Sequence, residues 1–284
     1  MIPAAMLALA LAAGDDPACP PAHAAMGHCT PSAGAPPRAE PPSEATTGPA
    51  FAADTVWGAQ AMAPSRQAVF DMHGDVRGHR VLIDRLEARA QDGKDGYAWD
   101  GQAWFGGDYD RLVLKTTAEG RRDRTPETAE VQALWSHALD PWFELQAGVR
   151  HDFHRGQDRT HLALGVQGLA PYWFEVDAAA FVSDRGAVSA RVEAEYDMRL
   201  TNRLILQPRL EANLAAQTTR STGAGAGLST LETGLRLRYA LKPEFAPYVG
   251  VDYHRGFGDT ADLARAAGEK AGGWTLVAGV RAWF

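Results

Sequence analysis

The chain has 284 residues and a formal net charge of −7, with 45% hydrophobic and 22% charged residues. An acidic chain lacks the basic face that a phosphate backbone requires, so nucleic acid is excluded as the main partner. The mean hydropathy is −0.27, and no stretch approaches the roughly 18 apolar residues that a membrane-spanning helix needs. A helical membrane protein is therefore excluded. A membrane β-barrel is not, because only alternate residues of its strands meet lipid.

Residues 1–14 form an apolar, alanine-rich run that is typical of a secretory signal peptide with a small-residue cleavage region. The usual basic start of such a peptide is missing from it, so we expect the true start to lie upstream. The alternative is a short buried helix. We predict that residues 1–14 are part of a signal peptide.

Residues 15–78 are rich in Pro, Ala and Gly and contain three Pro-Pro pairs. Few of these residues could build a core, which predicts a disordered or loosely structured segment on the periplasmic side. The two cysteines, Cys19 and Cys29, both lie in this segment. They could pair in an oxidising periplasm, or either could bind a metal ion, and the sequence leaves these alternatives open.

From about residue 80 to the end, segments of roughly ten alternating residues follow one another between turn residues, as in a membrane barrel. Every second residue of the closing segment is apolar: Trp274, Leu276, Ala278, Val280, Ala282 and Phe284. A period of two predicts a strand with one apolar face. The composition of 187–199 would also suit a helix, but its charges would then surround the helix, so a strand is favoured.

The predicted strands are 80–90, 97–106, 109–118, 128–138, 142–153, 160–169, 172–183, 187–199, 203–216, 228–241, 245–255 and 274–284. One face carries Glu, Asp, Arg, Gln or His in nearly every strand, which is too much charge for a soluble core. We therefore predict an all-β fold, a transmembrane antiparallel β-barrel of about twelve strands over 79–284, after a disordered N-terminal segment. Its charged face lines a hydrated lumen, and its apolar face contacts outer-membrane lipid.

The connections between predicted strands alternate between short and long, with 184–186 as the exception. This alternation predicts that the C-terminus and the short turns lie in the periplasm. The mixed charges of the lumen are expected to pair across strands and to narrow the pore. The alternative is a carboxylate-lined path for cations. The best candidates for that path lie on neighbouring strands: Glu175, Asp177, Glu193 and Glu195.

Several runs in 80–284 then show a resemblance to a known family: Ala98–Trp104, Gly148–Asp152, Gly165–Glu175, Leu204–Asn213, Phe245–Gly250, Thr260–Arg265 and Val280–Phe284. In this order they resemble the copper resistance protein B family, over nearly all of the predicted barrel. The resemblance implies a protein of the cell outer membrane that acts in copper resistance. It also implies a periplasmic multicopper oxidase as a partner.

Members of that family often carry a Met/His/Asp-rich repeat in the N-terminal segment, whereas such residues are sparse here. The candidate copper ligands are His23, Met26, His28 and Cys29, followed by Met72, His73 and His79. Thioether, thiol and imidazole groups are ligands that select copper, and Met and Cys favour Cu+. The sequence leaves open whether Cu+ or Cu2+ is bound. The alternative is that these residues occur by chance in a secreted linker.

The predicted function is non-enzymatic: the protein binds copper ions and assists their movement or sequestration at the outer membrane. One alternative is a lipid hydrolase, which needs a Ser and a nearby His on the lipid-facing side. Ser136 and His137 are adjacent and point to opposite faces, and Ser183 and Ser189 are expected to have no His at the same level. The other alternative is a general small-solute porin, but a small barrel crowded with long charged side chains leaves little channel.

Overall fold

The computed structural model describes Gly48 and residues 51–74, 76–91, 95–121, 126, 128–154 and 158–284. The chain divides into two compact units, Met1–Val69 and Phe70–Phe284. Within the described residues, no helix combines the length and the apolar character needed to cross a membrane.

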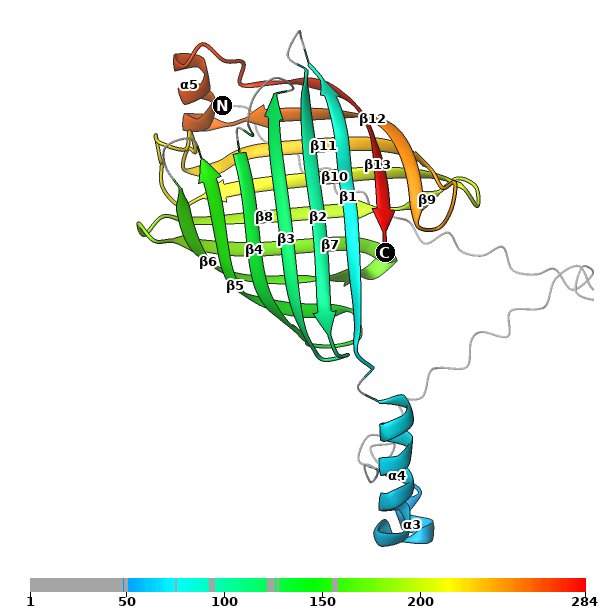
Figure 1. Cartoon of the computed structure of the whole chain (residues 1–284). Helices are drawn as coiled ribbons and strands as arrows, with labels where there is room; N and C mark the ends of the chain where they lie inside the picture. The colour runs from blue at the N-terminus through cyan, green and yellow to red at the C-terminus, as the bar shows by residue number, and fades with distance from the viewer. Residues whose placement is uncertain are drawn as a thin grey trace, which may run out of the picture. The chain divides into compact units, whose positions relative to one another are not determined.

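The second unit contains an antiparallel sheet that closes on itself to form a barrel (Figure 1). Its strands are β1 (Gly78–Ala90), β2 (Gly96–Gly106), β3 (Asp110–Arg121), β4 (Thr128–Ala138), β5 (Phe143–His154), β6 (Arg159–Ala170), β7 (Phe174–Ser183), β8 (Val188–Tyr196), β9 (Met198–Arg199), β10 (Leu204–Ala215), β11 (Gly227–Tyr239), β12 (Phe245–Gly256) and β13 (Gly272–Trp283). Neighbours in the chain pair with one another, and β13 pairs with β1 to close the ring. Because β8 and β9 are two parts of one strand that both pair with β10, the described part of the barrel has twelve strands. The predicted fold class is confirmed.

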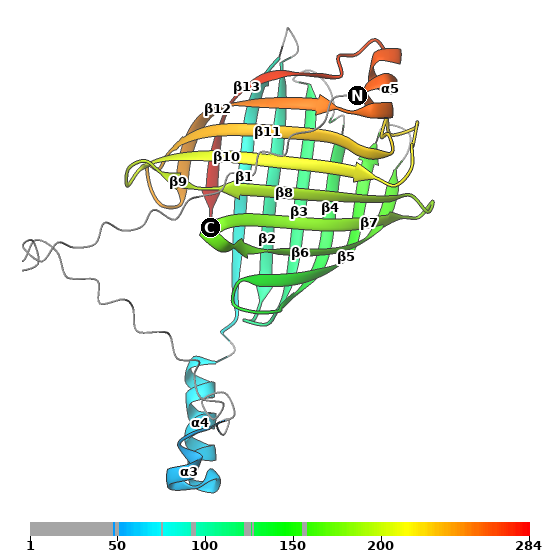
Figure 2. The ribbon, with the colours of Figure 1, turned by 180° about the vertical axis from the view of Figure 1, so that it is seen from behind.

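The two ends of the barrel differ in the length of their connections (Figure 2). The turn end has the connections 107–109, 139–142, 171–173, 200–203 and 240–244, and the C-terminus lies there as well. The loop end has the connections 91–95, 122–127, 155–158, 184–187, 216–226 and 257–271. The longest of these carries α5 (Gly258–Ala266), a helix that the sequence analysis did not predict. The predicted alternation is confirmed except at 91–95, 155–158 and 184–187, which are no longer than the longest turn, 240–244.

Two helices lie where the sequence predicts no regular structure: α3 (Asp54–Trp57) and α4 (Ala59–His73). The side chains of Arg66 and Asp54 form an ion pair between them. The expectation of disorder rests on the composition of the whole range 15–78. Its prolines lie almost entirely before residue 50, and Pro64 is the only one after it. The later part is rich in alanine, which has the highest helix propensity, so helices form there. In this part of the segment the structure therefore has local helices, where a disordered or loosely structured segment is expected from the sequence. Most of 15–50 lies outside the described residues.

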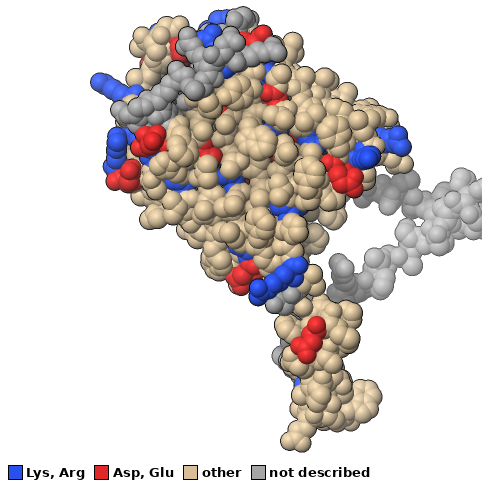
Figure 3. All heavy atoms as spheres, in the orientation of Figure 1, with Lys and Arg blue, Asp and Glu red and all other residues tan. Residues whose placement is uncertain are grey.

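The barrel is apolar outside and charged inside, which is the reverse of a soluble protein. Leu164 and Leu276 on the outer surface are 57% and 66% exposed, whereas Arg209 and Arg236 on the inner surface are 4% and 2% exposed. The space-filling view shows a wall made mainly of uncharged residues, with charged side chains gathered toward the ends (Figure 3). An outer surface this apolar is shielded from water only when the barrel lies in a lipid bilayer. The predicted assignment of the two faces is therefore confirmed.

A β-bulge in β1 changes which residues of that strand face the lumen. The register of β1 against β2 shifts between Ile83 and Arg85. Leu82 before the bulge and Asp84 within it line the lumen, and after the bulge Arg85 does so as well. A bulge inserts one residue into one strand and reverses the alternation beyond it. As a consequence, two adjacent charged residues of β1 both point inward.

Leu164→Arg is expected to destabilise the inserted barrel by about 2–4 kcal/mol, because Leu164 lies mid-strand in β6 and faces lipid. Leu228→Arg near the loop end of β11 is the matched control, and its cost is expected to be about 0–1 kcal/mol because its charge reaches the interface. Urea-dependent unfolding from lipid vesicles measures both. Equal costs at the two positions would contradict the placement of β6 across the bilayer.

Candidate functional site

Three cavities lie along the described part of the lumen. The turn-end cavity has a volume of about 430 Å³ and is lined by residues such as Arg111, Glu144 and Glu175. The acidic cavity, of about 310 Å³, is lined by residues such as Glu119 and Glu232. The loop-end cavity, of about 330 Å³, lies beneath α5. The three cavities share lining residues, such as Arg191, so they adjoin one another inside the barrel.

The structure brings the four predicted lumen carboxylates together in the turn-end cavity. Glu175 of β7 lies directly opposite Glu195 of β8, and Asp177 lies opposite Glu193. Like charges that face each other across two strands destabilise a sheet unless other groups compensate them. The arrangement therefore requires cations nearby.

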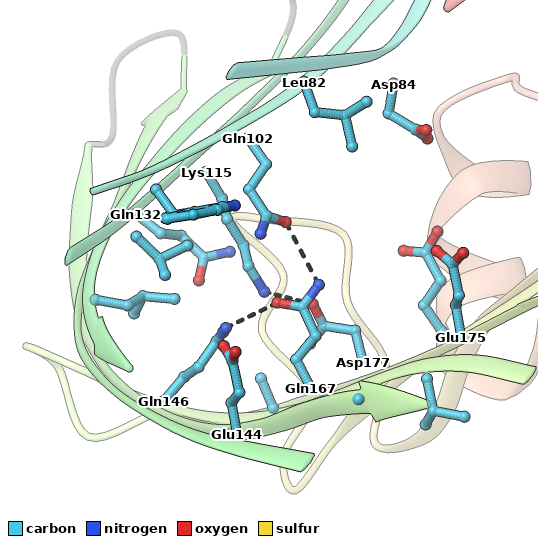
Figure 4. A pocket seen from close by; sticks show the side chains of 18 of the residues that line it. Leu82, Asp84, Gln102, Lys115, Gln132, Glu144, Gln146, Gln167, Glu175 and Asp177 are labelled. Atoms are coloured by element: carbon cyan, nitrogen blue, oxygen red, sulfur yellow. Dashed lines mark hydrogen bonds and ion pairs between the residues drawn. The ribbon is translucent and has the colours of Figure 1, made fainter. Parts of the chain in front are cut away.

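Two basic residues supply most of that compensation. Lys115 forms an ion pair with Asp177 (Figure 4). Nε of Arg209 lies 2.5 Å from a carboxylate oxygen of Glu193 and 3.3 Å from one of Glu195. Glu175 differs from the other three, because no described Lys, Arg or His lies within 4.0 Å of its carboxylate. It is the carboxylate of this group that remains available to an entering cation.

A row of amide side chains crosses the same cavity from one wall to the other (Figure 4). Nε2 of Gln146 donates to Oε1 of Gln167 at 2.7 Å, and Nε2 of Gln167 donates to Oε1 of Gln102 at 3.4 Å. Gln102 lies on β2 and Gln167 on β6, which are not adjacent in the sheet. The row therefore narrows the lumen.

Ion pairs fill the space between the cavities. Arg209 also contacts Glu211 and lies 2.9 Å from Glu232, so that it contacts four carboxylates. Its side chain is 1% exposed. Nη2 of Arg191 lies 3.0 Å from Glu130. The predicted pairing of mixed charges across strands is confirmed.

Four inward charges of β1 are not among the residues predicted to line the lumen: Asp84, Arg85, Glu87 and Arg89. Strict alternation cannot place all four on one face, because Asp84 and Arg85 are neighbours in the chain. Their adjacency inside a strand, where the polar positions change phase, is the signal that could have found the bulge. Tyr248 was also missed, since it lies near a strand end like the aromatic residues of a membrane interface. It is 5% exposed inside the barrel and donates a hydrogen bond to Glu87 at 3.0 Å.

The predicted copper ligands are spread over separate parts of the chain. His23, Met26, His28 and Cys29 lie outside the described residues. Met72 and His73 are the last two residues of α4, and both are exposed. His79 lies on the outer surface of β1, where its ring stacks on that of Phe105 with centroids 6.2 Å apart. Within the described residues, no three His, Cys, Asp or Glu side chains are grouped to hold a metal ion.

The Ser and His residues considered for a hydrolase do not form a catalytic pair on the lipid side. Ser136 points inward and donates to Glu144 at 2.7 Å, whereas His137 points outward and contacts Asp110 at 2.9 Å. The expectation that Ser183 has no His at its level is wrong, because register between strands places it opposite His161. Both residues face the lumen, however, and the hydroxyl oxygen of Ser183 accepts hydrogen bonds from backbone amides of its own turn.

Comparisons with known proteins cover the barrel from its first strand to its last residue. The family model described as copper resistance protein B precursor (CopB) matches residues 78–284. Copper resistance protein B of Escherichia coli is 46% identical over 213 residues, which are 75% of this chain and 72% of that protein. The copper resistance protein B homolog of Pseudomonas syringae pv. tomato is 46% identical over 230 residues, 77% of this chain and 76% of that protein. Among solved structures, the KdgM porin in complex with disordered oligogalacturonate has a TM-score of 0.47 and 12% identity, over 72% of this chain and 99% of that chain.

Proposed function

The chain belongs to the copper resistance protein B family, and from this premise we propose that it binds copper ions at the outer membrane and assists their movement or sequestration there. The proposed role is non-enzymatic. Copper is the cargo of the protein in this proposal, and outer-membrane lipid surrounds its wall.

The observation that carries the proposal is the group of four carboxylates in the turn-end cavity. Its lining contains no His, Cys or Met among the described residues, so the donors are oxygen atoms, which suit Cu2+ better than the softer Cu+. Three of the four carboxylates already contact Lys115 or Arg209. An entering ion must compete with these cations, so its binding is weak enough for release, as movement through a lumen requires.

The N-terminal candidates supply the complementary chemistry. His23, Met26, His28 and Cys29 are soft or borderline donors, of which Met and Cys favour Cu+. Short turns face the periplasm in bacterial barrels, so we place the turn end and the N-terminal segment on the periplasmic side. We propose that this segment captures copper there, with Met72, His73 and His79 as further donors, and that a periplasmic multicopper oxidase is its partner.

Copper titration of the purified full-length protein tests the proposal. We expect binding of both ions, with Cu+ measured under reducing conditions against a competing chelator. Changing His23, Met26, His28 and Cys29 together to Ala should weaken Cu+ binding by about tenfold or more, a loss of about 1.4 kcal/mol. Cu2+ binding should instead weaken in the double variant Glu175→Gln, Glu195→Gln.

Asp262→Asn provides the matched control for the lumen variant, because it removes a carboxylate that is 73% exposed on α5. It should leave Cu2+ binding unchanged. A wild-type protein that binds neither copper ion would refute the proposal. If the double variant still binds Cu2+ like the wild type, the turn-end cavity is not the Cu2+ site.

A further inference from the structure

The loop-end cavity differs from the other two in the chemistry of its lining. Six hydroxyl-bearing residues line it: Ser189, Thr219, Thr222, Ser229, Thr230 and Thr260. Its charged lining residues are Arg150, Asp152, Arg159, His161 and Arg191. Basic groups therefore outnumber acidic ones here, whereas carboxylates outnumber basic groups in the acidic cavity.

Two of the three arginines are neutralised by carboxylates. Arg150 donates from Nε and Nη2 to the two oxygens of Asp152, at 2.6 and 2.9 Å. Arg191 donates to both oxygens of Glu130, at 3.2 and 3.0 Å. Such two-point pairs satisfy a carboxylate well, so Asp152 has little left to offer a cation.

Arg159 has no such partner. It is 8% exposed, and within the described residues no carboxylate lies within 4.0 Å of its guanidinium. Nη2 donates to Oγ of Ser221 at 2.6 Å, while Nε has no hydrogen-bond partner among the described groups. A buried charge without a counter-charge is costly, and a guanidinium offers five donors. The site therefore favours an anion.

His161 completes the pair of unused donors. It lies two residues along the same strand, is also 8% exposed, and faces the same cavity. Nδ1 has no hydrogen-bond partner among the described groups, since the nearest carboxylate oxygen, of Asp152, is 3.8 Å away. Two buried polar side chains from one strand thus direct unsatisfied nitrogen atoms into one chamber.

The roof of the chamber is fixed by contacts between α5 and the loop 216–226. The backbone N–H of Gly225 donates to Oγ1 of Thr260 at 2.7 Å, and Oγ1 of Thr218 donates to Asp259 at 2.5 Å. These contacts hold hydroxyl-bearing residues of both segments over the cavity. The hydroxyl group of Thr260 is thereby positioned in advance, which lowers the entropy cost of binding a ligand beside it.

We propose that the loop-end cavity binds a small free oxyanion of the phosphate class, held by Arg159 and His161 and surrounded by Ser and Thr hydroxyl groups. The volume of about 330 Å³ accommodates such an ion with several waters. The donors lie inside the barrel, where a lipid headgroup outside the wall does not reach them. This site includes neither Glu175 nor the N-terminal copper candidates. The proposal of an anion site can therefore be tested independently of the proposed copper function.

Titration of the full-length protein in detergent with inorganic phosphate, followed by 31P NMR line broadening, tests the proposal. We expect saturable binding that sulfate displaces and chloride at equal ionic strength does not. Arg159→Gln should weaken binding about tenfold or more, because a charge-assisted hydrogen bond is lost. Arg185→Gln is the matched control, since it removes the same charge from an exposed side chain at the same end of the barrel, and it should bind normally.

If Arg159→Gln does not fold, phosphate titration of the wild-type protein still tests the proposal. Absence of saturable phosphate binding at millimolar concentration would overturn it, as would equal displacement by chloride. His161→Gln gives a second test, with weaker binding expected. Unchanged phosphate binding in a folded Arg159→Gln protein would also overturn the proposal, whatever its copper affinity.

Discussion

Replacing Arg236 with Gln is expected to destabilise the folded barrel by about 3–5 kcal/mol, the cost of breaking a buried ion pair from one side. Arg236 is on β11, and its Nε donates to Glu87 of β1 at 2.7 Å. Nη1 and Nη2 donate to the two oxygens of Asp252 on β12, at 3.1 and 3.0 Å. The three side chains are at most 2% exposed, so Gln would leave Glu87 without a counter-charge and would leave Asp252 only the weaker contact with Arg89, whose Nη2 lies 3.5 Å away.

The cluster of Arg236, Glu87 and Asp252 lies where the barrel closes. It joins β11 and β12 to β1, across the β13–β1 pairing that closes the barrel. Glycines make room for it, because a Cβ at Gly234 would lie 2.4 Å from an oxygen of Asp252. A Cβ at Gly250 would lie 2.9 Å from Cγ of Arg236. The cluster therefore stabilises the contact between the first and last strands.

Urea-dependent unfolding in lipid vesicles measures the effect, with Arg265→Gln as the control. Arg265 pairs with Asp262 at 2.6 Å on α5, but these side chains are 64% and 73% exposed. An exposed pair contributes about 0–1 kcal/mol, so the control should unfold almost like the wild type. Similar losses in both variants would contradict the assignment of the cluster of Arg236, Glu87 and Asp252 as a contact that closes the barrel.

The barrel itself could be predicted from the sequence because alternation is a local property of the chain. Each strand carries its own evidence, as in the closing segment with Leu276 and Ala278 on one face. The family resemblance, confirmed by the match over 78–284, was likewise present in contiguous runs. The face that each of Glu175, Asp177 and Glu193 occupies follows from the same counting.

Alternation within a strand does not predict the register between neighbouring strands or the position of a β-bulge. The bulge after Ile83 reverses the faces of β1, so Arg85 and Glu87 were not assigned to the lumen. The pairing of Ser183 with His161 depends on the stagger between β6 and β7, which the turn fixes and local composition does not. Which carboxylate lacks a partner also depends on side chains from distant strands, as with Lys115 of β3 and Asp177 of β7.

Replacing Arg209 with Gln is the second change with a large expected effect. Its guanidinium contacts Glu193, Glu195, Glu211 and Glu232, from three neighbouring strands. Removing it leaves four carboxylates around one site, so we expect a loss of about 3–5 kcal/mol or more in the free energy of unfolding. The double variant Arg209→Gln, Glu232→Gln should recover part of this loss, because one repelling charge is then removed. Residues in one network couple by about 0.5–3 kcal/mol in such cycles.

The same change should also turn the centre of the barrel into a stronger cation site. With the guanidinium gone, the carboxylates that it neutralised are free to bind a divalent ion, so Cu2+ should stabilise Arg209→Gln more than it stabilises the wild type. Unfolding in urea with and without Cu2+ measures this difference, and Arg265→Gln should show none of it. If Cu2+ stabilises Arg209→Gln no more than the wild type, the lumen carboxylates do not act as copper donors, and Arg209 serves the structure of the barrel alone.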